Sequence, residues 1–125
     1  SFIVFDITRD PFPTADLWLC RDCLFHLSYR DILAALRNFV NSGIRYALVT
    51  NCRNLTGFAN TDIRSGGFRK LELMAEPFCL PTDAMVRIRE GGERGDGEHE
   101  MCLWERTAIA AALPAFALKI GSTAG

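Results

Sequence analysis

The amino-acid sequence lacks several features that would place it in a broad class of protein. None of its apolar runs approaches the roughly 20 residues that a membrane-spanning helix needs. Its 14 basic residues are balanced by 15 acidic residues, so it has no basic excess of the kind that sequence-independent nucleic-acid binding requires. Residues 1–10 contain neither a basic n-region nor a cleavage site, so they are not typical of a signal peptide. We therefore expect no membrane partner and no nucleic-acid partner.

The cysteines do not have the pattern of a secreted, disulfide-bonded protein. There are five of them, an odd number, and most lie in apolar stretches: Cys20, Cys23, Cys52, Cys79 and Cys102. Reduced, buried cysteines of this kind are typical of intracellular proteins. The sequence therefore predicts a cytoplasmic location.

The stretch from Ala15 to Gly43 organises the rest of the chain. Leu17–Cys20 is a short apolar run typical of a buried strand, and the loop Arg21–Leu27 follows it. Ser28 is a natural N-cap for a helix whose single apolar stripe is formed by Ile32, Leu33, Leu36, Phe39 and Val40. Gly43 is expected in the C′ position of this helix, where a left-handed backbone suits glycine.

A second apolar run, Ile44–Thr50, predicts the next buried strand. Strand, helix and strand within about 35 residues form one right-handed crossover of a parallel sheet. The expected fold class is therefore α/β. The loop Arg21–Leu27 then lies at the carboxyl end of a strand, which is where open α/β sheets bind their ligands.

The segments outside this unit are shorter or less regular. Phe2–Ile7 predicts another buried strand, whereas residues 51–81 contain no sustained periodicity. Met85–Arg89 and Met101–Glu105 alternate apolar with charged residues on either side of a glycine-rich polar stretch. This pattern predicts an antiparallel hairpin with a long tip.

We expect a single domain over residues 1–125. Its parts are a core (1–51), an irregular segment (52–82), the hairpin (83–106) and a tail (107–125). Within the tail, Thr107–Ile120 predicts a short helix that Pro114 interrupts.

Several runs along the chain occur in an order that has a counterpart in a known family. They are FIVFDIT, ADLWLCRDCLFHLS, IRYALVT, the irregular NTDIRSGGFRKLEL and the closing LWER. In this order they resemble the second half of a class I S-adenosylmethionine-dependent methyltransferase. Members of that family have a Rossmann-like sheet in the order 3-2-1-4-5-7-6, with strand 7 antiparallel. The resemblance implies that Phe2–Ile7, Leu17–Cys20 and Ile44–Thr50 correspond to strands 3, 4 and 5, and the hairpin to strands 6 and 7.

One departure from the family concerns its glycine-rich cofactor loop. That loop follows strand 1, whereas this sequence begins at the equivalent of strand 3, and its only G-x-G pattern, Gly95–Gly97, lies in the polar hairpin tip. We therefore expect a truncated methyltransferase-like domain. The equivalent of strand 4 would then present an open apolar edge, so we expect a homo-oligomer that forms across this edge or by exchange of Phe2–Ile7.

The resemblance also implies which residues would serve S-adenosylmethionine and its acceptor. The cofactor-binding positions are Asp6, Ile7, Cys20 and Arg21. A general base for the acceptor would be Asp22 or His26. The acceptor-binding positions lie in the irregular segment and are Asn60, Asp62, Arg64 and Arg69. The acceptor is expected to be a small molecule, and the arginines suit an anionic one.

Several of these residues also have a purely structural interpretation. Asp6 can cap the end of a strand, His26 can be a partly buried histidine bonded to the backbone, and Arg64 and Arg69 can be solvated loop residues. The run from Cys20 to Cys23 is a C-x-x-C at a strand–helix junction, a pattern typical of dithiol redox proteins. The remaining cysteines and histidines have no spacing that indicates a metal site. Three functions stay open: a methyltransferase, a non-catalytic remnant that self-associates or binds a partner, and a dithiol redox protein.

Overall fold

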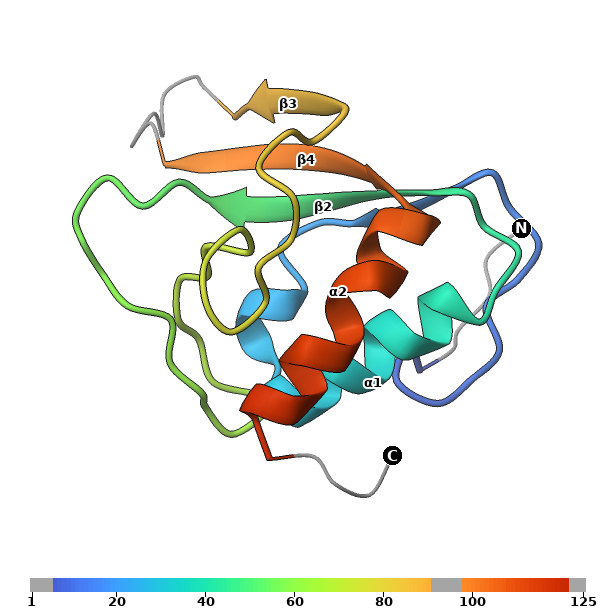
Figure 1. Ribbon diagram of the computed structural model, residues 1–125, viewed down its shortest axis with the longest axis horizontal. Helices are drawn as coiled ribbons and strands as arrows, with labels where there is room; N and C mark the ends of the chain where they lie inside the picture. Colours follow the sequence, from blue (N-terminus) through green and yellow to red (C-terminus); the bar gives the residue numbers. More distant parts are fainter. Residues whose placement is uncertain (1–5, 91–97, 122–125) are drawn as a thin grey trace.

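A computed structural model describes residues 6–90 and 98–121 of the chain. The elements follow one another in the order β1 (Leu17–Cys20), the 3-10 helix η1 (Leu24–His26), α1 (Tyr29–Val40), β2 (Tyr46–Cys52), β3 (Val86–Arg89), β4 (His99–Glu105) and α2 (Arg106–Lys119). The four strands form one sheet, and both α-helices lie on the same side of it (Figure 1). The predicted α/β class is therefore confirmed, in the form of an open, mixed sheet.

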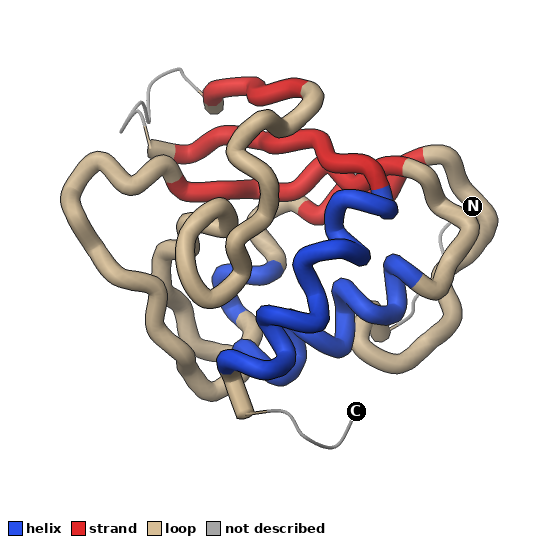
Figure 2. The backbone as a smooth tube through the Cα atoms, viewed as in Figure 1, coloured by secondary structure: helices blue, strands red, loops and turns tan. Residues whose placement is uncertain are grey.

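The strand order of the sheet is β1-β2-β4-β3. β1 and β2 are parallel neighbours joined by the crossover through α1, as predicted, although β2 begins two residues later than the sequence indicated. β4 is antiparallel to both β2 and β3, which confirms the predicted hairpin. The second strand of the hairpin, and not the first, lies beside β2, as the strand layer in Figure 2 shows.

Helix α1 begins where its sequence predicts. The hydroxyl of Ser28 accepts a hydrogen bond from the backbone N–H of Asp31 at 3.1 Å, which caps the first turn. The helix ends at Val40, however, and Gly43 does not have the left-handed backbone expected of it. The last turn is instead closed by Ser42, whose N–H and hydroxyl both donate to the carbonyl of Phe39, so no left-handed residue is needed.

The prediction of a strand over Phe2–Ile7 is not fulfilled in its described part. Residues 2–5 lie outside the described residues, and Asp6 and Ile7 belong to a turn. The carboxylate of Asp6 accepts hydrogen bonds from the N–H and the hydroxyl of Thr8, and its carbonyl accepts from the N–H of Asp10. These local bonds compete with strand pairing, which is how aspartate initiates turns.

Helix α2 also differs from its prediction, because Pro114 does not interrupt it. The helix continues from Arg106 to Lys119 with Pro114 inside it. Pro114 lies on the exposed side, whereas Leu113 and Phe116 are buried against the core. Water can therefore hydrate the carbonyl that the proline leaves without a donor, and the packing of the buried side holds the helix together. No helix in the described ranges is long and apolar enough to cross a bilayer.

The core lies between the sheet and the two helices and is rich in aromatic side chains. The largest fully buried residues include Trp104, Phe25, Phe39, Phe78 and Phe116. Four buried side chains come from the long segment between β2 and β3, namely Leu71, Leu73, Phe78 and Leu80. This segment has no helix or strand, as predicted, but its apolar anchors pack it into the core.

The opposite face of the sheet is not covered by any described helix. Leu19 of β1 and Ile88 of β3 are 58% and 51% exposed on this face. A row of neighbouring apolar side chains crosses all four strands, in the order Leu19, Leu48, Leu103 and Val86. These side chains belong to an open apolar surface with a groove of about 340 Å³, lined by Asp16, Leu17, Tyr46, Leu48, Val86, Ile88 and Leu103.

Candidate functional site

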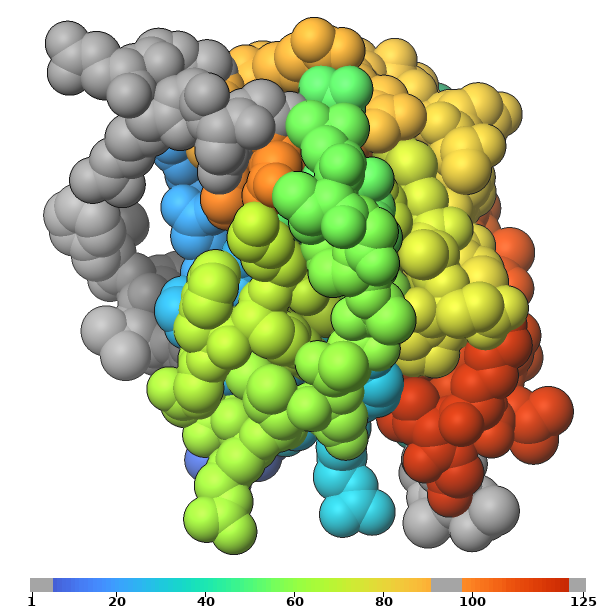
Figure 3. Space-filling model, turned by 90° about the vertical axis from the view of Figure 1, so that its left-hand side faces the viewer, coloured from blue at the N-terminus to red at the C-terminus, as the bar shows by residue number. Residues whose placement is uncertain are grey.

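The loop after β1 and the irregular segment after β2 lie side by side at one end of the sheet. The N–H of Gly66 donates to the carbonyl of His26 at 2.8 Å, and the N–H of Arg69 donates to the carbonyl of Phe25 at 3.2 Å. Figure 3 views the molecule from this end, where residues 51–70, in green, cover much of the surface. The structure therefore brings together the two parts of the chain in which most of the predicted site residues lie.

The carboxyl end of β1 presents two charged side chains at the surface. Arg21 is exposed and lies 3.3 Å from the carboxylate of Glu90. Asp22 has a left-handed backbone, with φ of 52°, and its N–H donates to the hydroxyl of Thr50 at 2.8 Å. Aspartate tolerates this conformation better than most residues do. The bond to Thr50 ties the loop to β2 and leaves the carboxylate of Asp22 exposed.

His26 is held in one orientation by the irregular segment. Its Nδ1 lies 2.9 Å from the carbonyl oxygen of Gly67, and its ring contacts the ring of Phe68 with centroids 5.6 Å apart. Because a carbonyl only accepts, Nδ1 carries the proton and Nε2 of the neutral ring is an acceptor. The structural and the catalytic interpretations of His26 are thus compatible: one nitrogen is bonded to the backbone and the other can take up a proton.

Cys20 and Cys23 interact with each other in the same loop. The hydrogen bond between their side chains raises the pKa of Cys20, and burial raises it further. The same bond lowers the pKa of Cys23 to about 7 against the opposing effect of burial, with an additional contribution from His26. The two thiols of the C-x-x-C run therefore differ strongly in their acidity.

Three of the four predicted acceptor-binding residues hold the irregular segment in place. The amide of Asn60 donates to the carbonyls of Glu72 and Glu76, and the carboxylate of Asp62 accepts from the N–H of Tyr29 at 2.8 Å. The guanidinium of Arg69 donates to the backbone carbonyls of Thr61, Leu24 and Phe25. Arg69 is therefore half-buried and bonded to the backbone, which corrects its interpretation as a solvated loop arginine. Arg64 is exposed.

Asp6 and Ile7 are not brought together with the other predicted site residues. The side chain of Asn38, near the end of α1, donates to the carbonyl of Ile7 at 2.9 Å. Helix α1 starts beside the carboxyl end of β1 and runs toward the opposite end of the sheet (Figure 1). Asp6 and Ile7 thus lie at the far end of α1 from Cys20 and Arg21.

The sequence did not identify a buried polar network that connects β2, the hairpin and the irregular segment. Asn51, at the end of β2, accepts from the N–H of Leu73 and donates to the carboxylates of Glu72 and Glu100. Glu100 is 1% exposed and receives two hydrogen bonds from Arg87, at 2.6 and 3.0 Å. Arg87 lies on a predicted arm of the hairpin, but Glu100 lies in the stretch that the sequence assigned to the polar tip. Their pairing depends on the longer β4 and on the register of β3 and β4.

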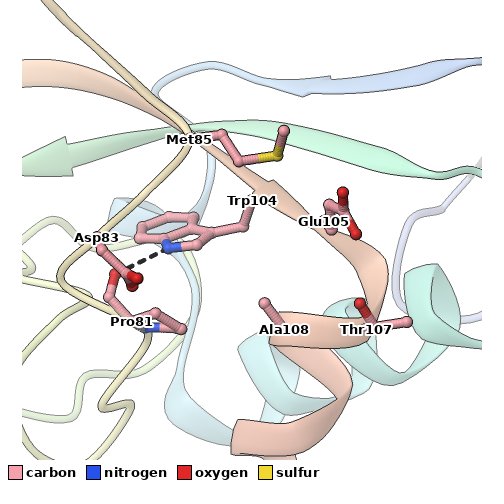
Figure 4. Close-up of a pocket in the computed structure, with 7 residues that line it drawn as sticks. All are labelled: Pro81, Asp83, Met85, Trp104, Glu105, Thr107 and Ala108. Atoms are coloured by element: carbon pink, nitrogen blue, oxygen red, sulfur yellow. Dashed lines mark hydrogen bonds between the residues drawn. The ribbon is translucent and has the colours of Figure 1, made fainter.

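Two hollows lie away from the predicted residues. One of about 430 Å³ lies where β4 continues into α2, and Figure 4 shows its lining residues: Pro81, Asp83, Met85, Trp104, Glu105, Thr107 and Ala108. The indole N–H of Trp104 already donates to the carbonyl of Pro81 at 2.9 Å, so it is not available to a ligand. The other, of about 420 Å³, is lined by Arg53, Arg87, Arg89 and Glu100.

The described residues contain no group of three or more side chains suited to hold a metal ion.

Comparisons with known proteins give no relative, since no family model, no curated protein and no solved structure matches the chain. A function must therefore be inferred from the arrangement of this chain alone. Two features of that arrangement are informative. They are the order of the strands and the meeting of two loops at the carboxyl ends of β1 and β2.

Proposed function

We propose that this chain carries the acceptor-side part of a class I S-adenosylmethionine-dependent methyltransferase. The observation that supports the proposal is the strand order β1-β2-β4-β3, with β1 parallel to β2 and β4 antiparallel between β2 and β3. Strands 4, 5, 7 and 6 of that family have the same order and the same directions. Consecutive strands usually pair as neighbours, so the insertion of β4 between β2 and β3 is the informative feature.

The residues at the carboxyl end of β1 fit one part of the cofactor. The side chain of Arg21 is exposed there, and the carboxylate of the methionine part would replace Glu90 as its ion-pair partner. Asp6 and Ile7 do not fit an adenine site in the described structure, because they lie at the far end of α1. The proposed cofactor contacts are therefore limited to Cys20 and Arg21.

Methyl transfer needs a donor, an oriented acceptor and a site for the proton that leaves the acceptor. When bound, S-adenosylmethionine supplies a methyl group whose bond electrons return to sulfur as a lone pair of the acceptor forms the new bond. His26 offers Nε2 for the departing proton, because its Nδ1 is fixed by Gly67. Asp22 is the other candidate base, and Arg64 provides an exposed cation for an anionic small acceptor.

The proposal predicts that the chain binds the cofactor at the carboxyl end of β1. We expect calorimetric titration with S-adenosylmethionine, or with its demethylated product, to give a Kd in the micromolar range, about 8 kcal/mol. The variant Arg21→Gln should weaken binding about tenfold, because it removes the cation that pairs with the carboxylate. The control Arg45→Gln changes an exposed arginine at the amino end of β2 and should bind as the unchanged chain does. Absence of heat and of a thermal shift at millimolar ligand would contradict the proposal for this chain.

A cytoplasmic location is part of the same proposal. What supports it is the cysteine pattern: five is an odd number, and Cys20, Cys52 and Cys102 are buried, as reduced thiols of intracellular proteins often are.

The open apolar surface of the sheet favours a second candidate function, that of a non-catalytic module that self-associates. β1 is an edge strand of the described sheet, and its side chains Leu17 and Leu19 are exposed on the same face as Val86 and Ile88 of β3, the opposite edge strand. Exposed apolar edges pair readily with another chain. We propose that a second copy of the chain would cover this edge and the adjoining face.

Self-association is tested by light scattering over a wide range of concentration. We expect the apparent mass of the unchanged chain to rise toward that of a dimer, and Leu19→Lys to keep the chain monomeric, because a lysine blocks an edge strand. Leu118→Lys is the matched control, since Leu118 is 79% exposed on α2, on the other side of the sheet. A monomer at every concentration for the unchanged chain would rule out this candidate.

A further inference from the structure

Two cysteines lie on either side of a fixed turn in the loop that follows β1. Cys20 is the last residue of β1 and is 3% exposed, whereas Cys23 is half-buried. They are three residues apart, and Cys23 is the N-cap of η1. The left-handed backbone of Asp22 turns the chain between them, and the bond from its N–H to Thr50 fixes this turn on β2. Cys20 and Cys23 therefore flank a fixed turn at the C-x-x-C spacing of dithiol redox sites.

We propose that Cys20 and Cys23 form a reversible disulfide, so that the loop after β1 is a dithiol redox site. The two cysteines have different roles, which follow from their exposure. Cys23 is accessible and meets an external disulfide first, whereas Cys20 is shielded and resolves the intermediate. This inference does not depend on the binding of S-adenosylmethionine.

The acidity of the two thiols supports these roles. The pKa of Cys23 is lowered to about 7, because Cys20 donates a hydrogen bond to it and His26 lies nearby. A larger share of Cys23 than of an ordinary cysteine is then thiolate at neutral pH, and the thiolate is the form that attacks a disulfide. His26 is the last residue of η1, three residues after Cys23, and residues at this spacing lie on the same side of a 3-10 helix.

The proposed reaction is a thiol–disulfide exchange with a low-molecular-weight disulfide such as oxidised glutathione. The thiolate of Cys23 attacks one sulfur, forms a mixed disulfide and releases one glutathione thiolate. Cys20 then loses its proton and attacks the sulfur of Cys23, which releases the second glutathione. Two electrons pass from the protein dithiol to glutathione disulfide, and two molecules of reduced glutathione are formed.

The other three cysteines provide the comparison that the test needs. Cys52 and Cys102 are fully buried. Cys79 is exposed, and its sulfur lies 3.6 Å from the ammonium group of Lys119, at the end of α2. The variant Cys79→Ser therefore removes the other accessible thiol without a change in the loop after β1.

The test is performed on the Cys79→Ser chain in glutathione buffers of defined ratio. After an acid quench, the remaining thiols are alkylated and the peptides are mapped by mass spectrometry. We expect two fewer alkylated cysteines in oxidising buffer, a Cys20–Cys23 link in the peptide map, and full recovery with dithiothreitol. The rate of alkylation of Cys23 should have a midpoint near pH 7, and at pH 7 it should exceed that of a cysteine in a short peptide about fivefold.

Single variants separate the two roles. In Cys20→Ser, the reaction should end at a stable mixed disulfide between Cys23 and glutathione. In Cys23→Ser, the number of cysteines that can be alkylated should not fall by two in oxidising buffer. If a variant does not fold, the map of the Cys79→Ser chain is decisive by itself. The inference is overturned if Cys20 and Cys23 stay fully alkylatable in oxidised glutathione, or if the bond that forms joins a different pair of cysteines.

Discussion

Replacing Arg87 by methionine is expected to destabilise the fold by about 3–5 kcal/mol, because it leaves a buried carboxylate without its cation. Glu100 is 1% exposed, and the guanidinium of Arg87 binds both of its oxygens. Asn51 donates to the same carboxylate but brings no charge. Methionine keeps most of the packing of the arginine stem, so urea unfolding at pH 7 measures mainly the loss of the ion pair.

A double variant provides the control for this prediction. The double variant Arg87→Met, Glu100→Gln no longer buries a carboxylate at position 100. The side-chain oxygen of the new glutamine can still accept the hydrogen bond from Asn51. We expect the double variant to recover more than half of the lost stability. A single variant that loses less than about 1 kcal/mol, or a double variant no more stable than the single one, would show that Glu100 is not a buried charge that depends on Arg87.

The same pair gives the fold a dependence on pH. Burial raises the pKa of Glu100, but the hydrogen bonds from Arg87 and Asn51 and the charge of Arg87 outweigh it and hold the pKa below the ordinary value of 4.5. A group whose pKa is lower in the folded state than in the unfolded state stabilises the fold at pH values above its unfolded-state pKa. This stabilisation is lost as the pH falls through the folded-state pKa. We therefore expect Glu100→Gln to flatten the loss of stability below about pH 4.5 in acid unfolding curves.

Replacing Arg69 by methionine is expected to cost about 2–4 kcal/mol, because three backbone carbonyls lose a charged donor. The guanidinium joins the carbonyl of Thr61 to those of Leu24 and Phe25 and lies 5.5 Å from the centre of the Tyr29 ring. It therefore fastens the irregular segment to the loop after β1. Unfolding by urea measures the loss, and hydrogen exchange should show faster opening of residues 60–69.

Two further variants make this prediction specific. Arg69→Lys should lose an intermediate amount, because an ammonium group on one stem cannot reach all three carbonyls in the geometry of a planar guanidinium. Arg64 lies in the same segment, but its side chain is exposed. We therefore expect Arg64→Met to change the free energy of unfolding by no more than about 0.5 kcal/mol. Equal effects of Arg69→Met and Arg64→Met would refute the role assigned to Arg69.

The roles of Arg69 and Asn60 show why a candidate site is harder to predict than a fold. Both were predicted to bind the acceptor because the family resemblance places the acceptor at the irregular segment in which they lie. The structure shows that their donors are already directed at backbone carbonyls within the protein. A segment without helix or strand leaves its backbone groups without regular partners, so some polar side chains must satisfy them. The sequence does not tell which ones do.

Local patterns in the sequence predicted α1, β1 and the hairpin. The apolar stripe and the Ser28 cap define α1, and four apolar residues define β1, because each pattern depends only on near neighbours along the chain. Alternation likewise predicted the hairpin of β3 and β4.

Features that depend on distant partners were set by the packing of the folded chain. Periodicity does not specify that β4 lies between β2 and β3, because pairing joins segments far apart in the sequence. Pro114 stays within α2 because the packing of Leu113 and Phe116 outweighs one lost hydrogen bond. Whether a charged or polar side chain serves a ligand or the fold depends on which groups the folded chain brings within hydrogen-bonding distance, and a sequence pattern does not contain that distance.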